Sequence, residues 1–357
     1  MDLLQQARAE IDTVDAEMAA LFERRMRAVA DVVRYKAETG KPVFDAAREA
    51  AVLDKNTARI TDEALRPYYR AFLSDAMSIS RAYQRARLGR DTAAYQGVPG
   101  AWSHIALRRL FPFARETACT TWGEVFDAVQ NGDAQFGVLP FENSNAGDVS
   151  TVLDLLYTHP DIIIARMCDL PIRQDLLGVP GAKVDEITQV FSHEQGFAQC
   201  PKFLGEHPAW VTTPYFNTAI AARHVAEMGD KHCAAIASRL AAKHYGLEIL
   251  APDIHTFDGN HTRFIVVSAS PTPIGIPDKA TVTFTLRHER GTLMRALSSF
   301  VAMGMNMTHI ESRPLHNSNW EYCFYVDLTG NLRESNLGVL MGSLQGDCEN
   351  CRLLGAY

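Results

Sequence analysis

Four polar residues stand together where a short hydrophobic run begins near residue 260. Asn260, His261, Thr262 and Arg263 come directly before the strand-forming residues 264–267. They bring an amide, a hydroxyl and a guanidinium to the start of a strand, and such groups donate hydrogen bonds to small oxyanions. A loop that simply ends at Thr262 is the alternative explanation.

Further polar residues follow other short hydrophobic runs in the middle of the chain. They are Asn143, Ser144 and Gly147 in VLPFENSNAGDV, Ser192 and Gln195 in VFSHEQGFAQC, Asn217 and Thr218 in PYFNTAIAA, and Ser238 in AIASRLAA. Taken one at a time, each of these residues can be explained as the N-cap of a helix, and Ser192 and Gln195 together can be explained as a capping box. Several helix N-termini that converge on one crevice also bind anions, because their free N–H groups point into it.

An arginine interrupts the hydrophobic seam of the N-terminal segment. Leu4, Ile11 and Met18 are followed at the same heptad position by Arg25. A charge in such a seam is unfavourable unless it is paired, although a single arginine can extend its head to water. Further candidates in this segment are Arg8, Lys36, Arg48, Ser80 and Gln84.

These cations and neutral donors predict a pocket for a small dianion. Ser80 and Gln84 are four residues apart and share a helix face. Arg8 and Arg25 are separated by roughly 25 Å along one straight helix. Both reach the same ligand only if Arg8 comes from a second copy of the chain.

The elements that must position these residues fall into three segments. Residues 1–88 predict three helices, with the first ending at Gly40, the second beginning at Asp45 and the third running from about Thr61 to Arg87. From Ala93, short apolar runs alternate with helical stretches, which predicts an α/β fold with a mostly parallel sheet. Residues 271–278 predict a linker, and residues 279–357 show a βαββαβ pattern with a helix over 334–345.

Composition excludes several classes of function. The formal charge of −7 argues against nucleic acid as the main partner, although local arginines still hold small anions. Seven scattered cysteines predict a reducing, cytoplasmic location, and the lone CxxC of Cys348 and Cys351 does not predict a metal site. No apolar run approaches the ~18 residues of a membrane span, and the acidic N-terminus does not suit a signal peptide.

Residues 1–88 resemble the all-helical chorismate mutase class. The stretches ARAEID, FERRMRAV, RYKAETGKPVFDAARE and SISRAYQ supply Arg8, Arg25, Lys36, Asp45, Arg48, Glu49, Ser80 and Gln84. The resemblance implies rearrangement of chorismate to prephenate without a cofactor. Lys36 and Gln84 then donate to the ether oxygen, the three arginines hold carboxylates, and Glu49 accepts from the substrate hydroxyl.

Residues from about Tyr95 to Val267 resemble prephenate dehydratases. The stretches YQGVPGAWSHIA, PFENSNAGDV, FSHEQGFAQC, FNTAIAA, AAIAS…YGLEIL and GNHTRFIVV occur in the order of that family. The resemblance implies that Thr262 donates to the departing ring hydroxyl of prephenate. It implies orienting roles for Asn143, Ser192 and Gln199, and substrate contacts for Arg263 and Thr218.

Three positions depart from the usual pattern of that family. Trp102 and His104 stand where tyrosine and glutamate are commoner, and Asn217 stands for a serine. The two α/β lobes also resemble periplasmic solute-binding folds, so a binding module without catalysis stays an alternative.

The C-terminal segment resembles an ACT regulatory domain through RGTLMRAL and IESRPL. The resemblance implies an allosteric site for L-phenylalanine between two such domains of a dimer, formed by Gly291, Thr292, Leu293, Glu311, Ser312, Arg313 and Pro314. Taken singly, Gly291 is explained by a turn and Arg313 by a surface ion pair. Thr292 stands where alanine is usual.

The whole chain resembles the bifunctional chorismate mutase–prephenate dehydratases. The expected domains are a mutase over 1–90, a dehydratase over 93–270, a linker over 271–278 and an ACT domain over 279–357. The family implies formation of phenylpyruvate without a cofactor, feedback by L-phenylalanine, and a homodimer or larger assembly. A non-catalytic sensor and an arogenate-preferring dehydratase stay open, whereas a nicotinamide-dependent dehydrogenase lacks its GxGxxG motif.

Overall fold

A computed structural model describes residues 2–89, 91–145, 147–269, 277–286, 289–315, 321–332 and 334–357. The chain forms two compact units. One is Met1–Asp91 with Phe113–Arg115, and the other is Thr92–Pro112 with Glu116–Tyr357. None of the helices in the described part of the chain combines the length and the apolar character needed to cross a membrane.

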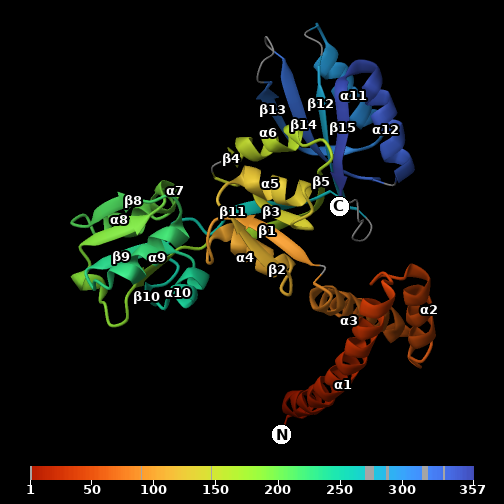
Figure 1. The fold of residues 1–357 in the computed structure, drawn as a ribbon, viewed down its shortest axis with the longest axis horizontal. Helices are drawn as coiled ribbons and strands as arrows, with labels where there is room; N and C mark the ends of the chain where they lie inside the picture. Colours follow the sequence, from red (N-terminus) through yellow and green to blue (C-terminus); the bar gives the residue numbers. More distant parts are fainter. Residues whose placement is uncertain are drawn as a thin grey trace. The chain divides into compact units, whose positions relative to one another are not determined.

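The first unit is helical, as predicted (Figure 1). Its elements are α1 (Leu3–Thr39), α2 (Ala46–Thr57), the 3-10 helix η1 (Glu63–Leu65) and α3 (Arg66–Arg87). Gly40 ends α1 in the left-handed conformation, with φ of 68°. Asp45 caps α2 by accepting from the Arg48 N–H at 2.9 Å. The third helix begins later than predicted, because Asp62 first caps the separate 3-10 turn.

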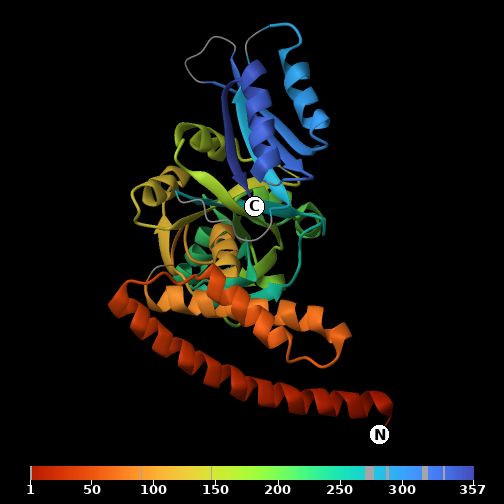
Figure 2. The ribbon, with the colours of Figure 1, turned by 90° about the vertical axis from the view of Figure 1, so that its right-hand side faces the viewer.

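Helix α1 is one continuous, gently bent rod (Figure 2). Most of its predicted apolar seam is uncovered within a single chain, where Leu4 and Ile11 are each 57% exposed and Leu21 is 60% exposed. Val33, near the other end, is buried. An apolar stripe of this length is unfavourable in water unless another surface covers it.

The second unit begins with an α/β lobe. Its elements are β1 (Thr92–Gln96), α4 (Trp102–Leu110), β2 (Arg115–Cys119), α5 (Trp122–Gln130), β3 (Phe136–Asn143), β4 (Gly147–Asp148), α6 (Ser150–Thr158), β5 (Ile163–Pro171) and β11 (His261–Ser268). The sheet order is β2-β1-β3-β11-β5, with β4 paired to β3. Val125, Phe126, Leu139 and Leu153 are fully buried in its core.

A second lobe is inserted between β5 and β11. Its elements are β6 (Asp175–Gly178), η2 (Val184–Glu186), β7 (Gln189–Ser192), α7 (Glu194–Ala198), α8 (Pro201–Gly205), β8 (Val211–Pro214), α9 (Thr218–Met228), β9 (Cys233–Ala237), α10 (Arg239–Tyr245) and β10 (Glu248–Ala251). The sheet order is β10-β6-β9-β7-β8.

The prediction of a mostly parallel sheet is wrong, because both sheets are mixed. Strand β1 is parallel to β3, and β7 is parallel to β8 and β9. Strand β11 is antiparallel to both neighbours, and β6 is antiparallel to β9 and β10. In the first sheet, the chain leaves along β5 and returns along the neighbouring β11 after the inserted lobe, so these two strands run in opposite directions.

The C-terminal segment has the predicted βαββαβ order. Its elements are β12 (Lys279–Thr285), α11 (Thr292–Ala302), β13 (Asn306–Pro314), β14 (Tyr322–Thr329), α12 (Glu334–Asp347) and β15 (Glu349–Ala356). The antiparallel sheet has the order β13-β14-β12-β15, and both helices cover one of its faces (Figure 1). Most of the predicted linker, 271–276, lies outside the described residues.

Strand β14 connects this segment to the first lobe by simple alternation. Val326 and Leu328 pack in the core beneath α11 and α12. Cys323 and Tyr325 point to the opposite face and join the core of the first lobe, where the Tyr325 hydroxyl donates to the Leu153 carbonyl at 2.7 Å. The period of two in a strand therefore supplies both cores from one element.

Candidate active sites

A cleft of about 570 Å³ lies between the two α/β lobes, a size that suits a small ligand. Strands of the first sheet, loops and helices of the second lobe, and several helix N-termini contribute to its walls. The polar residues that line it include Asn143, Asp148, Ser150, Thr151, Gln174, His193, Gln195, Gln199, Asn217, Thr218 and Thr262. Of the predicted dehydratase residues, Asn143, Gln199, Thr218 and Thr262 lie at this cleft, whereas Ser192 and Arg263 do not line it.

The Thr262 hydroxyl is held in place by Asn143. Asn143 Nδ2 donates to Thr262 Oγ1 at 2.9 Å, to Asn260 Oδ1 at 2.9 Å and to the His261 carbonyl at 3.1 Å. Asn143 Oδ1 accepts from the Asn145 N–H at 3.0 Å. Because Thr262 Oγ1 accepts from the amide, its own hydrogen remains to be donated into the cleft.

Thr262 lies within a strand and not in a loop before one. Strand β11 begins at His261, and Thr262 pairs with Leu170 of β5 and with Asn143 of β3. A bulge follows between Arg263 and Phe264. The predicted strand start at Phe264 is therefore wrong by three residues, because two neighbouring strands pair with the polar residues as well.

A pair of glutamines forms part of the opposite wall. Gln174 Nε2 donates to Gln199 Oε1 at 2.8 Å, and Gln174 is 2% exposed. Gln174 Oε1 is buried and has no hydrogen-bond partner among the described residues. Sequence reasoning missed Gln174, although a polar residue directly before the apolar strand β6 was the available signal.

Ser192 supports the cleft from behind and has no access to it. It is fully buried, and its hydroxyl donates to the Ile236 carbonyl at 2.8 Å. Gly196 packs so closely that an added Cβ would collide with Ser192 Oγ. The cap of α7 is His193, whose Nδ1 accepts from the Gln195 N–H at 3.1 Å, so the predicted capping box is wrong.

The cleft presents neutral donors and helix ends in place of basic side chains. No lysine or arginine of the described chain lines it. Asn217 caps α9, whose first residue is Thr218, and Ser150 and Thr151 begin α6. Two lining tryptophans, Trp102 and Trp122, have buried indole N–H groups without a hydrogen-bond partner in the described residues.

Arg263 points away from the cleft. Its guanidinium pairs with Glu142 at 2.7 Å and with Asp169 at 3.1 Å. Burial acts to lower the pKa of Arg263, but the contacts with Asp169 and Glu142 together raise it. This position does not support the predicted contact with a substrate carboxylate, because neighbouring residues of a strand face opposite sides and Thr262 and Phe264 occupy the cleft side.

The helical unit brings together Arg25 and Ser80, as predicted. Arg25 Nη1 donates to Ser80 Oγ and, at 3.2 Å, to the Ala76 carbonyl. Burial lowers the pKa of Arg25 from its ordinary value. This half-buried cation has neutral hydrogen-bond acceptors around it, an arrangement that favours an anionic ligand.

Lys36 and Gln84 form a second pair beside α3. Lys36 Nζ donates to Gln84 Oε1 at 3.0 Å and to the Val43 carbonyl at 2.7 Å. The ammonium group faces the amide oxygen, so the amide NH₂ of Gln84 points elsewhere. Gln84 and Ser80 are 8% and 4% exposed.

The other predicted mutase residues lie nearer to the surface. Arg8, Asp45 and Arg48 are exposed. Glu49 pairs with Arg81, which also lies over the Phe44 ring. Sequence reasoning missed Arg81. Because Arg81 already pairs with Glu49, a substrate hydroxyl has to compete with Arg81 for the Glu49 carboxylate.

The predicted allosteric residues lie at the start of α11 and along β13. Gly291 has φ of 82°, and buried Thr292 donates to the Glu289 carbonyl at 3.0 Å. Leu293, Ser312 and Pro314 are exposed. Glu311 lies on β13, and its neighbour Arg313 makes two contacts with Asp154 of α6, at 3.1 and 2.8 Å, which raise the pKa of Arg313.

These two sites define the class of protein. The helical unit combines cations with neutral polar side chains, which suits a small dianion. The α/β cleft has a fixed hydroxyl, which suits an acidic substrate that must lose an oxygen. The family models agree, with chorismate mutase type II matching residues 7–85 and prephenate dehydratase matching residues 93–272.

Whole-chain comparison points to the same combination. A bifunctional chorismate mutase/prephenate dehydratase from Aquifex aeolicus is 30% identical, over 100% of this chain and 98% of its own. The prephenate dehydratase of Arthrobacter aurescens, solved in complex with L-Phe, is 31% identical with a TM-score of 0.69, over 74% of this chain and 89% of its own. The structure of GqqA, a quorum-quenching acylase, is 32% identical with a TM-score of 0.68, over 74% of this chain and 97% of its own.

The chain belongs to the family of bifunctional chorismate mutase/prephenate dehydratases. It rearranges chorismate to prephenate and then decarboxylates and dehydrates prephenate to phenylpyruvate.

Proposed function

We propose that the cleft between the α/β lobes is the dehydratase site and that Thr262 is its hydrogen-bond donor. The observation that carries this proposal is the fixed Thr262 hydroxyl, which accepts from Asn143 and lines the cleft. Loss of CO₂ breaks a carbon–carbon bond, and its electron pair moves through the ring as the carbon–oxygen bond of the hydroxyl breaks. The departing hydroxide takes a proton and leaves as water. A positioned donor at that oxygen stabilises the transition state.

The remaining cleft residues then orient the substrate. Gln199 is held by Gln174, and the N-termini of α6 and α9 face the cleft with Ser150, Thr151 and Thr218. Free N–H groups at helix N-termini hold carboxylates without a basic side chain. Ser192 acts indirectly, by holding the strand end against the Ile236 carbonyl.

Prephenate and arogenate are told apart by direct comparison. Arogenate replaces the keto group of prephenate with an amino group, so it brings an ammonium in place of a neutral carbonyl. Steady-state kcat/KM for both substrates on one preparation decides the preference. A sensor without catalysis is excluded by sustained formation of phenylpyruvate from prephenate. The acylase GqqA covers 74% of this chain, and the geometry of the described cleft residues does not favour acyl transfer over dehydration.

The mutase site is proposed at the seam of α1 and α3. Arg25, Lys36 and Gln84 surround it, and the reaction needs only a compact conformer and charge stabilisation at the ether oxygen. Arg8 lies about 25 Å from Arg25 along the helix. A homodimer through the exposed seam of α1 brings in the second copy's Arg8 and covers Leu4 and Ile11. Sedimentation at micromolar concentration tests this assembly.

Feedback by L-phenylalanine is proposed for the C-terminal βαββαβ domain. The solved relative from Arthrobacter aurescens carries L-Phe and covers 74% of this chain. The left-handed Gly291 and the exposed Leu293 offer backbone groups and an apolar surface at the start of α11. Calorimetric titration with L-phenylalanine beside a dehydratase assay tests the proposal, and absence of both heat and inhibition contradicts it.

A further inference from the structure

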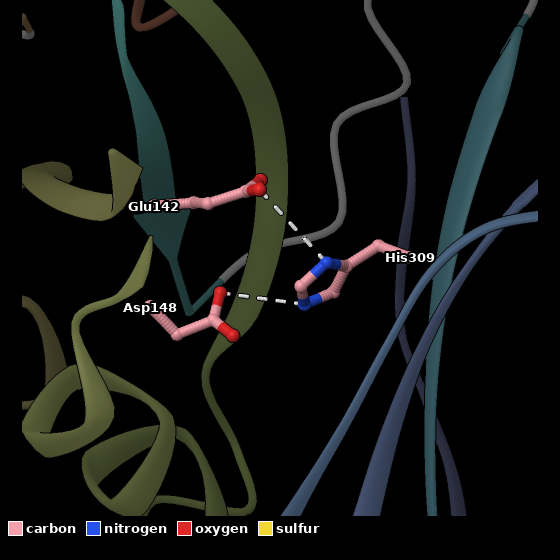
Figure 3. A group of neighbouring side chains, drawn as sticks. All are labelled: Glu142, Asp148 and His309. Atoms are coloured by element: carbon pink, nitrogen blue, oxygen red, sulfur yellow. Dashed lines mark ion pairs between the residues drawn. The ribbon is translucent and has the colours of Figure 1, made fainter. Parts of the chain in front are cut away.

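One histidine of the C-terminal domain reaches the wall of the dehydratase cleft. His309, on β13, lies between Glu142 of β3 and Asp148 of β4 (Figure 3). Its Nε2 is 3.3 Å from Asp148 Oδ1, and its Nδ1 is 4.0 Å from Glu142 Oε1. The side chains of His309 and Asp148 are 16% and 13% exposed.

Asp148 is the nearer of the two carboxylates that His309 contacts. Asp148 Oδ1 and His309 Nε2 are both sheltered from water, and neither has a hydrogen-bond partner in the part of the chain that the structure describes. The geometry is that of an ion pair rather than an aligned hydrogen bond. This sheltered carboxylate oxygen and this sheltered ring nitrogen therefore stabilise each other.

Asp148 belongs to an element that needs support. Strand β4 has only two residues, Gly147 and Asp148, which pair with Asn143 and Glu142 of β3. Both residues line the cleft, as do Val149, Ser150 and Thr151, which follow them into the N-terminus of α6. A two-residue strand has few hydrogen bonds of its own, so an ion pair from outside helps to fix this wall.

The charges around His309 favour its protonated form. Charged groups near it are Asp148 on β4, Glu142 on β3, Asp327 on β14, Glu311 on β13, and Arg263 on β11, which is paired with Glu142. The contact with Asp148 raises the pKa of His309, burial opposes this, and Asp327 and Glu142 add to the rise. Burial raises the pKa of Asp327 and of Glu311 above their ordinary values.

We propose that His309 is a positioning residue for the dehydratase: its charged ring holds β4 and the start of α6 in the geometry that binds prephenate. The proposal rests on the placement of the dehydratase site in this cleft. The contact is complete below the ordinary histidine pKa of about 6.5 and is lost as pH rises through the raised value. The KM for prephenate therefore rises with pH in this window, while kcat, which Thr262 sets, changes little.

The test is a pH series of KM and kcat for prephenate on the full chain. His309→Gln raises KM roughly three- to tenfold at pH 6, the size expected for one partly buried ion pair, and removes the pH-dependent rise. His309→Lys keeps a positive charge and holds the low KM to higher pH. Arg313→Gln removes the ion pair that the same domain makes with Asp154 of α6 and leaves His309 in place, so the inflection stays in that variant.

Two further variants separate the possible causes of a pH effect. His193 also lines the cleft. If His309 causes the pH-dependent rise in KM, that rise persists in His193→Gln. If the protonated His309 ring, and not a metal ion, holds Glu142 and Asp148 together, chelation with EDTA leaves the KM unchanged. Thr262→Val tests the cleft itself: full activity there refutes the site assignment, whatever His309 does. A wild-type pH profile in His309→Gln, a His309→Lys variant that behaves like His309→Gln, or a KM that responds to EDTA overturns the positioning role.

Discussion

Thr262→Val isolates the hydroxyl on which the proposed dehydratase chemistry depends. Valine has nearly the shape of threonine and favours a strand equally well, so β11 keeps its pairing with β3 and β5. Asn143 Nδ2 loses one acceptor but retains Asn260 Oδ1 at 2.9 Å and the His261 carbonyl at 3.1 Å. The variant therefore removes one donor from the cleft with little other change.

The expected losses in stability and in rate differ widely. One neutral hydrogen bond contributes about 0.5–1.5 kcal/mol to stability, so the free energy of unfolding falls by no more than this. A preorganised donor to the leaving oxygen contributes roughly 3–4 kcal/mol in the transition state, which lowers kcat by a few hundredfold or more. Thr262→Ser is the matched control, because it keeps the hydroxyl and loses only the methyl group that fixes its rotamer.

The assay follows two reactions of one polypeptide. Phenylpyruvate formation from prephenate reports the dehydratase, and chorismate consumption reports the mutase, whose residues lie in a separate unit. Thr262→Val should lose the first and keep the second, while Thr262→Ser keeps both within about tenfold. Thr262→Val activity within tenfold of wild type, with an unchanged urea midpoint, would show that the hydroxyl is not the donor.

Three further outcomes are expected. Arg25→Ala should lose chorismate consumption and keep phenylpyruvate formation from added prephenate, and loss of both in a folded chain contradicts two separate sites. Gln84→Glu places a carboxylate beside Lys36, where only its protonated form donates, so mutase activity should climb as pH falls. A flat pH profile for that variant removes Gln84 from the site. Gly291→Val forces a β-branched residue to φ near 82° and should abolish inhibition by L-phenylalanine while dehydratase activity remains, which calorimetry and the activity assay check together.

Much of the helical unit could be predicted from the sequence because its determinants are local. Gly40 and Asp45 end and begin helices through their own backbone preference and side-chain cap, without any distant partner. Ser80 and Gln84 share a helix face because they are four residues apart. The βαββαβ order of the C-terminal segment follows in the same way from runs of apolar residues with periods of two and 3.6.

The partners of charged and polar groups were decided only by the tertiary structure. Thr262 and Asn143 are 119 residues apart, and Arg313 and Asp154 are 159 apart. Nothing local distinguishes an arginine that binds a ligand from one that pairs across two domains, as Arg313 does. Likewise, the sequence alone does not show whether a serine after a strand caps a helix, contacts a ligand or is buried. In the folded protein, Ser192 is buried against Gly196 and the Ile236 carbonyl.

The sequence by itself thus determined which elements form and which residue types gather at their ends. The tertiary structure decided which of those residues face the cleft, through strand alternation, the mixed direction of the sheets and contacts between segments. Thr262 faces the cleft and Arg263 does not because successive residues of β11 point to opposite sides of a sheet. His309 meets Asp148 because β13 packs against the first lobe, a juxtaposition that depends on the folded core and on no local pattern.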